Sequence, residues 1–257
     1  MPWAGLRLAV TLLTAVPLPG GRRPADTADG AAVPDRRVVA TAVYLAPIVG
    51  LALGGVAAGV LIGCRAGHLE PLLSAVLAIA VLAALTRALH LDGLADTADG
   101  LGSRLPAAQA LAVMKRSDIG PFGVVTLVLT LLVQVSALAQ AERLGRGPVG
   151  IVAATVAARL AITIACRRGV PSARPSGLGA LVAGTVHPVA AAALALAAIG
   201  AAAALGTIYA VAVAVGLGCS VLATMLAVRR LGGITGDVLG AVAELTTAAC
   251  LLVTAIG

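Results

Sequence analysis

The chain has 257 residues, of which 60% are hydrophobic and 11% charged, and its formal net charge is +7. Soluble domains carry about 25% charged residues, so this composition excludes a soluble globular protein and indicates an integral membrane protein. Aromatic residues make up only 2% of the chain, and the basic residues lie scattered among short polar segments. A nucleic-acid-binding face needs clustered basic residues with aromatic side chains between them, so we expect a lipid bilayer and no nucleic acid as partner.

Residues 2–19 are moderately apolar, contain Arg7 and end at Pro17 and Pro19, after which a polar segment follows. A secretory signal peptide has a similar apolar core, but Arg7 interrupts this one and no A-x-A-like cleavage site follows it. We therefore predict that residues 1–37 form an interfacial or re-entrant helix and a cytoplasmic linker.

Apolar segments long enough to cross a bilayer fill most of the remaining sequence. A spanning helix needs about 20 apolar residues, and the Ala and Gly residues that are abundant here favour close helix packing in membranes. We predict a single membrane domain over residues 1–257, an all-α integral membrane protein whose polytopic bundle of about seven transmembrane helices lies within 38–257. The predicted spans are Val38–Gly63, Pro71–Leu89, Phe122–Ala141, Val149–Cys166, Pro188–Leu205, Ile208–Val228 and Val238–Ile256.

The distribution of Lys and Arg predicts the orientation of the bundle. With the N-terminus in the cytoplasm, most basic residues face the cytoplasm, and only Arg65, Arg143 and Arg146 face the other side. Cytoplasmic segments carry an excess of Lys and Arg, so we predict a multi-pass protein of the cell membrane in this orientation. Loops at residues 90–121 and 167–187 then lie on the cytoplasmic side and are the expected active-site loops.

Three aspartates, Asp92, Asp96 and Asp99, follow the second predicted span. If this segment is helical, Asp96 and Asp99 lie about 40° and about 20° around the axis from Asp92, so that the carboxylates share one face. Like charges on one face favour a cation, and hard oxygen ligands suit Mg²⁺; the alternative is a solvated helix end with aspartate caps. Gly93 and Gly100 would let a phosphate approach the backbone closely. We predict a magnesium site here.

The last predicted span begins beside Asp237 and carries Glu244 two turns later on the same helical face. Ionisable side chains inside a span usually face a cavity or a partner, so this pair is a candidate for a second metal site or a general base. A hydrogen bond that holds Glu244 for packing reasons is the alternative. His90, which precedes the three aspartates, is a further catalytic candidate that could contact phosphate or tune an aspartate.

Basic residues suited to binding phosphate lie in three places. Lys115 and Arg116 precede the third span, Arg159 lies within the fourth, and Arg174 lies in the 167–187 loop. Arg binds phosphate oxygens in a bidentate manner, so these side chains could hold a pyrophosphate opposite the metal. Arginines at the ends of spans are better explained as signals of topology.

Four motifs in one order resemble the cobalamin synthase family, the membrane-bound adenosylcobinamide-GDP ribazoletransferases. They are His90-Leu-Asp-Gly-Leu-Ala-Asp-Thr-Ala-Asp-Gly-Leu101, Met114-Lys-Arg-Ser-Asp-Ile-Gly-Pro-Phe-Gly-Val124, Ala173-Arg-Pro-Ser-Gly-Leu-Gly179, and Gly232-Gly-Ile-Thr-Gly-Asp-Val-Leu-Gly-Ala241 with Glu244. The resemblance runs from about residue 5 to the C-terminus. Many members read Lys-Asp-Ser where this chain has Lys-Arg-Ser-Asp, which puts in doubt a role for Asp118.

The resemblance implies a reaction in which the 5′ oxygen of α-ribazole, or of its 5′-phosphate, joins the phosphate of cobinamide while GMP leaves. It implies Mg²⁺ as cofactor, held by Asp92, Asp96 and Asp99 with Asp237. On this interpretation Glu244 or Asp237 is the base, and the basic side chains steady phosphates. Association with other enzymes of nucleotide-loop assembly is a further expectation.

Two other classes compete with this interpretation. A CDP-alcohol phosphotransferase motif partly matches Asp96 to Arg104, but Val113 stands where that motif has a glycine. An ion-coupled transporter would use the acids as coupling sites, but those sites usually lie near the membrane midplane, and these acids cluster at one face.

Overall fold

The computed structural model describes residues 2–14 and 35–257, and these residues form helices with only two isolated backbone bridges and no strand. The helices are α1 Pro2–Leu13, α2 Arg36–Ala66, α3 Pro71–Leu85, α4 Leu89–Gly102, α5 Ala107–Val113, α6 Pro121–Arg143, α7 Gly147–Ala165, α8 Leu178–Val182, α9 Pro188–Leu205, α10 Thr207–Leu231 and α11 Gly236–Thr254. The predicted all-α bundle is confirmed.

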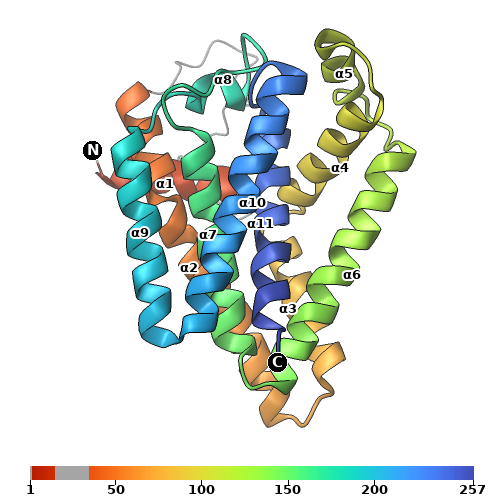
Figure 1. Cartoon of the computed structure of the whole chain (residues 1–257), viewed down its shortest axis with the longest axis vertical. Helices are drawn as coiled ribbons and strands as arrows, with labels where there is room; N and C mark the ends of the chain where they lie inside the picture. The colour runs from red at the N-terminus through yellow and green to blue at the C-terminus, as the bar shows by residue number, and fades with distance from the viewer. Residues whose placement is uncertain (1, 15–34) are drawn as a thin grey trace.

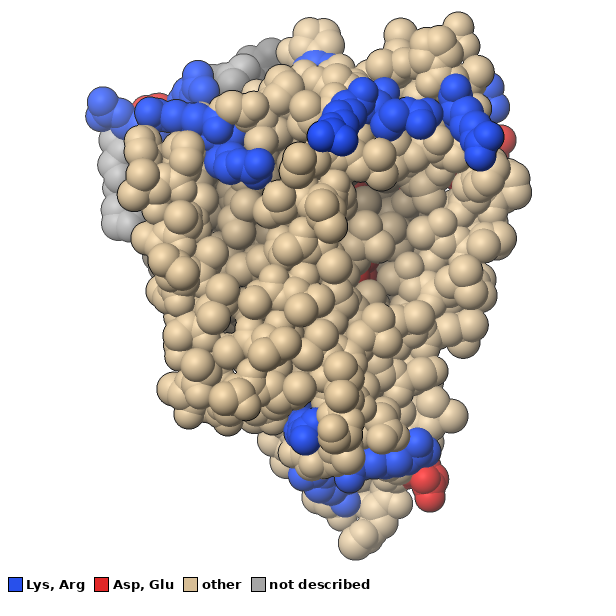
Figure 2. All heavy atoms as spheres, in the orientation of Figure 1, with Lys and Arg blue, Asp and Glu red and all other residues tan. Residues whose placement is uncertain are grey.

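Among the described residues, six helices are long and apolar enough to cross a membrane, namely α2, α6, α7, α9, α10 and α11. They coincide with six of the seven predicted spans and run side by side along the bundle (Figure 1). Figure 2 shows a broad belt between two bands of basic residues, in which charged side chains are visible only inside a hollow. Such a surface suits contact with lipid chains, flanked by headgroups at both ends.

The predicted span Pro71–Leu89 is wrong at its C-terminal end. Helix α3 stops at Leu85, the chain bends by 88°, and α4 begins at Leu89. Arg87 and Ala88 both adopt φ of 53° at this break, a left-handed conformation that ends a helix. The α3–α4 pair leads from the lower to the upper end of the bundle (Figure 1) and counts as a seventh crossing if the two halves are taken together.

The predicted loop at 90–121 is also wrong, because α4 and α5 occupy most of it. The helical conformation considered for its three aspartates is found, because they lie within α4. Helix α4 forms because its opposite side is buried, including Gly93, Leu94 and Ala95. An amphipathic helix gains most of its stability from packing such a face.

Helix α1 has 12 residues, which is too few to cross a bilayer. It lies crosswise to the spanning helices near the upper end of the bundle (Figure 1) and packs on α2, where Gly5 lies against Thr41. The interfacial or re-entrant placement of this helix stays a prediction. Most of the predicted linker, residues 15–34, lies outside the described residues.

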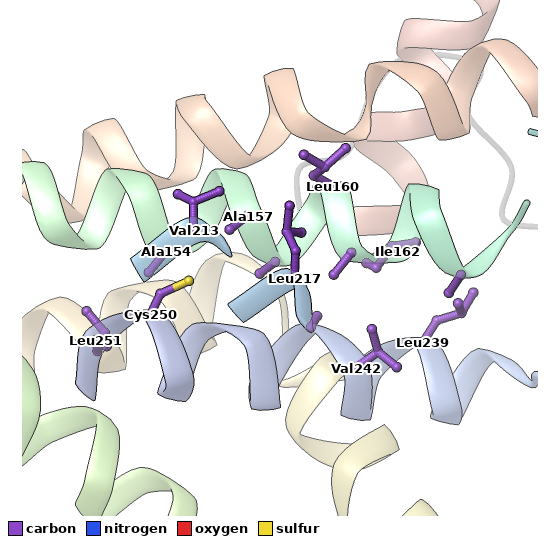
Figure 3. Packing of buried hydrophobic residues seen from close by; sticks show 14 of the residues in the cluster. Ala154, Ala157, Leu160, Ile162, Val213, Leu217, Leu239, Val242, Cys250 and Leu251 are labelled. Atoms are coloured by element: carbon purple, nitrogen blue, oxygen red, sulfur yellow. The ribbon is translucent and has the colours of Figure 1, made fainter. Parts of the chain in front are cut away.

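Helices α7 and α11 lie at the centre of the bundle, since 67% of the residues in the apolar 18-residue stretch of each helix are buried. Side chains of α7, α10 and α11 interleave there (Figure 3). Helix α2 approaches α7 closely at Gly50 and Gly54, both of which face Thr155. Small residues one turn apart are the usual means of bringing membrane helices together.

Pro47 lies inside α2 and lacks the N–H that would bond the carbonyl of Val43. The hydroxyl of Thr163 on α7 donates a hydrogen bond of 2.8 Å to that carbonyl. The Val43 carbonyl therefore has a hydrogen-bond partner in spite of the proline, and this bond fixes α2 against α7.

The loop at 167–187 is tied to the junction between α10 and α11. The Ala173 amide donates to the Ile234 carbonyl at 3.0 Å, and the Ile234 amide donates to the Pro171 carbonyl at 2.9 Å. Gly233 allows this approach, since a Cβ there would lie 2.6 Å from the Ala173 nitrogen. The loop thereby holds Arg174 beside the start of α11.

Candidate active site

A cavity of about 350 Å³ lies among α1, α2, α4, α7, α8 and α11. Most of its lining is apolar, and its titratable side chains are His90, Asp92 and Asp237, all predicted site residues. Asp92 belongs to the first of the four sequence motifs and lies on α4, and Asp237 belongs to the last and lies on α11. The fold therefore brings together groups that lie far apart in the chain.

The close crossing of α4 and α11 is what joins these groups. A Cβ at Gly93 would lie 2.6 Å from the Asp237 carbonyl oxygen, and one at Gly240 would lie 3.0 Å from the His90 carbonyl oxygen. Gly93 and Gly100 were predicted to admit a phosphate, and the structure corrects this. Gly93 admits the backbone of α11, and Gly100 packs against the side chain of Met114.

Asp99 is held differently from the other two aspartates of α4. It is only 8% exposed, and its Oδ2 and Oδ1 accept hydrogen bonds from the amides of Gly120 at 2.7 Å and Gly123 at 2.9 Å. Both amides lie at the N-terminus of α6, where backbone N–H groups have no helical partner. Asp99 thus caps α6 with both oxygens, and Asp92 and Asp96 are the carboxylates of α4 left open.

The open carboxylates form a repulsive group. Asp92, Asp237 and Asp99 all oppose a negative charge on Asp96, and Arg174 is the cation that counters them. Arg174 Nη1 lies 3.5 Å from Asp237 Oδ2, and its Nη2 donates to the Leu111 carbonyl at 2.9 Å. The Nε of Arg174 is buried without a hydrogen-bond partner. The unpaired Nε of Arg174 is suited to an anionic ligand. The excess negative charge of the aspartates requires that a cation bind with this ligand.

Within the described residues, no group of three His, Cys, Asp or Glu side chains lies close enough to hold a metal ion by itself. Mg²⁺ usually takes one or two protein carboxylates and fills its remaining positions with water and substrate phosphates. Asp92, Asp96 and Asp237 fit that pattern, because they are oxygen donors that repel one another. The magnesium site stays a prediction.

Glu244 and Arg159 lie in a second cavity of about 30 Å³, separate from the first. Gln134 Nε2 donates to Glu244 Oε2 at 2.8 Å, and Arg159, 4% exposed, attracts the Glu244 charge. The structure therefore does not bring Glu244 together with the Asp92 group, whereas Arg159 is close enough to His90 to act on its charge. Sequence reasoning missed Gln134, although a lone amide inside an apolar span is a signal for an interhelical hydrogen bond.

The remaining predicted residues have simpler surroundings. His90 is 4% exposed and its Nδ1 has no hydrogen-bond partner. Lys115 and Arg116 are exposed on the segment that joins α5 to α6. Asp118, in the same segment, is also exposed and forms neither of the two ion pairs found in the described part of the chain.

Comparison with known proteins gives one consistent result. The chain matches the family described as cobalamin-5-phosphate synthase over residues 5–255. It is 44% identical to the adenosylcobinamide-GDP ribazoletransferase of Frankia casuarinae, covering 97% of this chain and 93% of the relative. The proteins of that name from Nocardioides sp. and Bradyrhizobium diazoefficiens are 42% and 38% identical, covering 96% and 98% of this chain and 96% and 93% of theirs.

No solved structure matches the chain significantly. The sequence matches extend over all four motifs and both halves of the cavity. Neither the phosphotransferase nor the transporter alternative finds support in these matches. The chain belongs to the cobalamin-5-phosphate synthase family.

Proposed function

We propose that this protein is an adenosylcobinamide-GDP ribazoletransferase that completes the nucleotide loop of cobalamin. The relatives that match it over almost their whole length carry that name. The observation in the structure that supports the proposal most is the cavity whose apolar walls end at Asp92 and Asp237, with Arg174 beside them. Such a site can hold the apolar base of an acceptor while the charged groups face a pyrophosphate.

In the proposed reaction a free ribose hydroxyl of α-ribazole, or of its 5′-phosphate, forms a bond to the phosphorus attached to cobinamide. The bond from that phosphorus to the GMP oxygen breaks, and GMP leaves. The 5′ oxygen expected from the sequence cannot be the attacking atom in both acceptors, because in the 5′-phosphate it is already esterified. Asp237 is the base that accepts the proton of the attacking hydroxyl, because it lines the cavity while Glu244 does not. Thr235 Oγ1 donates to Asp237 Oδ2 at 3.2 Å and orients it.

Arg174 is the residue we assign to the pyrophosphate. Its Nε is buried and unpaired, and only one of its other nitrogens bonds a carbonyl. A phosphate oxygen would satisfy the free donor and draw the guanidinium away from Asp237. Lys115 and Arg116, being exposed, would contact the guanylate end of the donor substrate.

Mg²⁺ would be held by Asp92 and Asp96, while Asp237 acts as the base and Asp99 is left to its capping role. Bound there, it would supply charge neutralisation for the pyrophosphate and the leaving GMP. The mutual repulsion around Asp96 supports a cation at this place.

We assign the end of the bundle that carries α4, α5 and α8 to the cytoplasm, in the cell membrane. The upper band of basic residues in Figure 2 supports this orientation under the positive-inside rule. Both substrates are polar and phosphate-bearing or nucleoside-like, so a cytoplasmic site gives them direct access. Association with other enzymes of nucleotide-loop assembly stays a prediction.

The test uses protein purified in detergent, with adenosylcobinamide-GDP and α-ribazole, with and without Mg²⁺. We expect GMP and adenosylcobalamin in equal amounts, only with the metal, and none from Asp96→Asn. Glu70→Gln, an exposed acid at the start of α3, is the matched control and should keep full activity. Absence of both products from folded wild-type protein would refute the proposed function.

A further inference from the structure

The cavity beside Asp92 and Asp237 has two chemically different walls. Helices α4 and α11 supply its titratable groups, whereas α1, α2, α7 and α8 supply mainly Ala, Leu, Val and Ile side chains. Thr11 also lines it, but the Thr11 hydroxyl donates to the Arg7 carbonyl at 2.8 Å. The apolar wall therefore offers few free hydrogen-bonding groups and is suited to an apolar part of a ligand.

The size of the cavity discriminates between the two substrates. Ligand sites enclose about 300–1,000 Å³, and this cavity of about 350 Å³ is at the small end of that range. A bicyclic aromatic base with its ribose fits such a volume. A corrinoid macrocycle with its side chains and an attached guanosine diphosphate is several times larger and must lie mostly outside.

We propose that this cavity is the acceptor site, in which the dimethylbenzimidazole base of α-ribazole lies against α1 and α2. This inference rests on the proposed function and adds the location of the acceptor's binding site. The ribose then faces α4 and α11, so its attacking hydroxyl is directed to Asp237. His90 lines the same cavity, and its buried Nδ1 has no hydrogen-bond partner.

Three alanines determine how large a base the site accepts. Ala9 of α1 and Ala42 and Ala46 of α2 line the cavity and are each no more than 2% exposed. Larger side chains at these positions would occupy the space of the methyl groups on the base. The bond from Thr163 to the Val43 carbonyl fixes this part of α2, so the wall cannot easily retreat.

Steady-state kinetics of Ala46→Val test the assignment. We expect the KM for α-ribazole to rise about tenfold, equivalent to about 1.4 kcal/mol, while the KM for adenosylcobinamide-GDP stays within twofold. The variant should also lose the wild-type preference for the dimethylated base over the α-riboside of unsubstituted benzimidazole. Ala57→Val is the control, because Ala57 is buried on the same helix but does not line the cavity.

If Ala46→Val does not fold, Ala9→Val on the short peripheral helix α1 tests the same wall. A selective rise in the KM of the corrinoid substrate, or equal effects in the Ala57 control, would overturn the inference and leave the proposed function intact. A second measurement needs no turnover: α-ribazole alone, without Mg²⁺, should raise the denaturation temperature of wild-type protein but not of Ala46→Val. No protection of the wild type would also overturn the acceptor site.

Discussion

Replacing Asp99 separates a structural carboxylate from a chemical one, because Asp96 lies one turn away on the same helix. The Asp99 carboxylate accepts two amide hydrogen bonds, at 2.7 and 2.9 Å, from the N-terminus of α6. Asp99→Ala leaves both amides unsatisfied in a place where the native side chain is only 8% exposed. Water therefore replaces the lost acceptor poorly.

The size of the effect follows from these contacts. A helix cap is worth about 0.5–2 kcal/mol where solvent can substitute for it, and a hydrogen bond to a charged group about 1.5–3 kcal/mol. With two such bonds and little water, we expect Asp99→Ala to cost about 3 kcal/mol. At about 2–4 °C for each kcal/mol in a chain of this size, the denaturation temperature should fall by about 6–12 °C.

Asp96→Asn should behave in the opposite way. Its charge is opposed by three neighbouring carboxylates, so removing the charge should leave stability unchanged or raise it while GMP release is lost. Thermal denaturation in detergent, without metal or substrates, measures the first quantity, and GMP release with Mg²⁺ measures the second. The capping argument is refuted if Asp99→Ala has the same denaturation temperature as the wild type, or if Asp96→Asn is less stable than Asp99→Ala.

Three further outcomes are expected. Gly93→Ala should abolish transfer, because its Cβ would lie 2.6 Å from the backbone of α11, whereas Gly55→Ala, which meets nothing within 4 Å, should be as active as wild type; an active Gly93→Ala enzyme would contradict the close crossing. Glu244→Gln should destabilise by about 1.5–3 kcal/mol, because it removes the carboxylate that attracts the buried Arg159, and combining it with Arg159→Met should cost less than the sum of the two single losses; additive losses in denaturation measurements would rule out coupling. Glu142→Gln weakens an ion pair of 2.6 Å at the opposite end of the bundle and should lower the denaturation temperature by a few degrees without changing either KM; a changed KM would show long-range coupling to the site.

Hydropathy predicted most of the fold because lipid-facing helices need uninterrupted apolar residues. The predicted spans Pro188–Leu205 and Ile208–Val228 also leave the turn at Gly206 between them, and the φ of 149° at Gly206 shows why a glycine is needed there. The break after Leu85 could not be predicted in this way. It depends on two left-handed residues, Arg87 and Ala88, and on the tertiary contact that draws α4 to α11.

The sequence predicted which residues form the candidate site but not the separate role of each residue. Three aspartates at helical spacing looked equivalent in sequence, yet Asp99 binds the amides of Gly120 and Gly123, which lie over twenty positions later in the chain. Glu244 looked like a partner of Asp237 because two turns separate them. Its hydrogen bond to Gln134 is a contact between distant helices, which no spacing rule reveals.

The contacts that fix α4 and α11 explain how reactive groups are held in a protein made mostly of small apolar residues. Asp99 attaches α4 to the start of α6, Gly93 lets α4 touch α11, and the Ala173–Ile234 backbone bond attaches the Arg174 loop to α11. Each attachment uses backbone groups or a buried carboxylate, so Asp92 and Asp96 remain available for ligands. A framework of this kind keeps mutually repelling acids together at the end of an apolar cavity, which is the arrangement that the proposed metal and the proposed aromatic acceptor require.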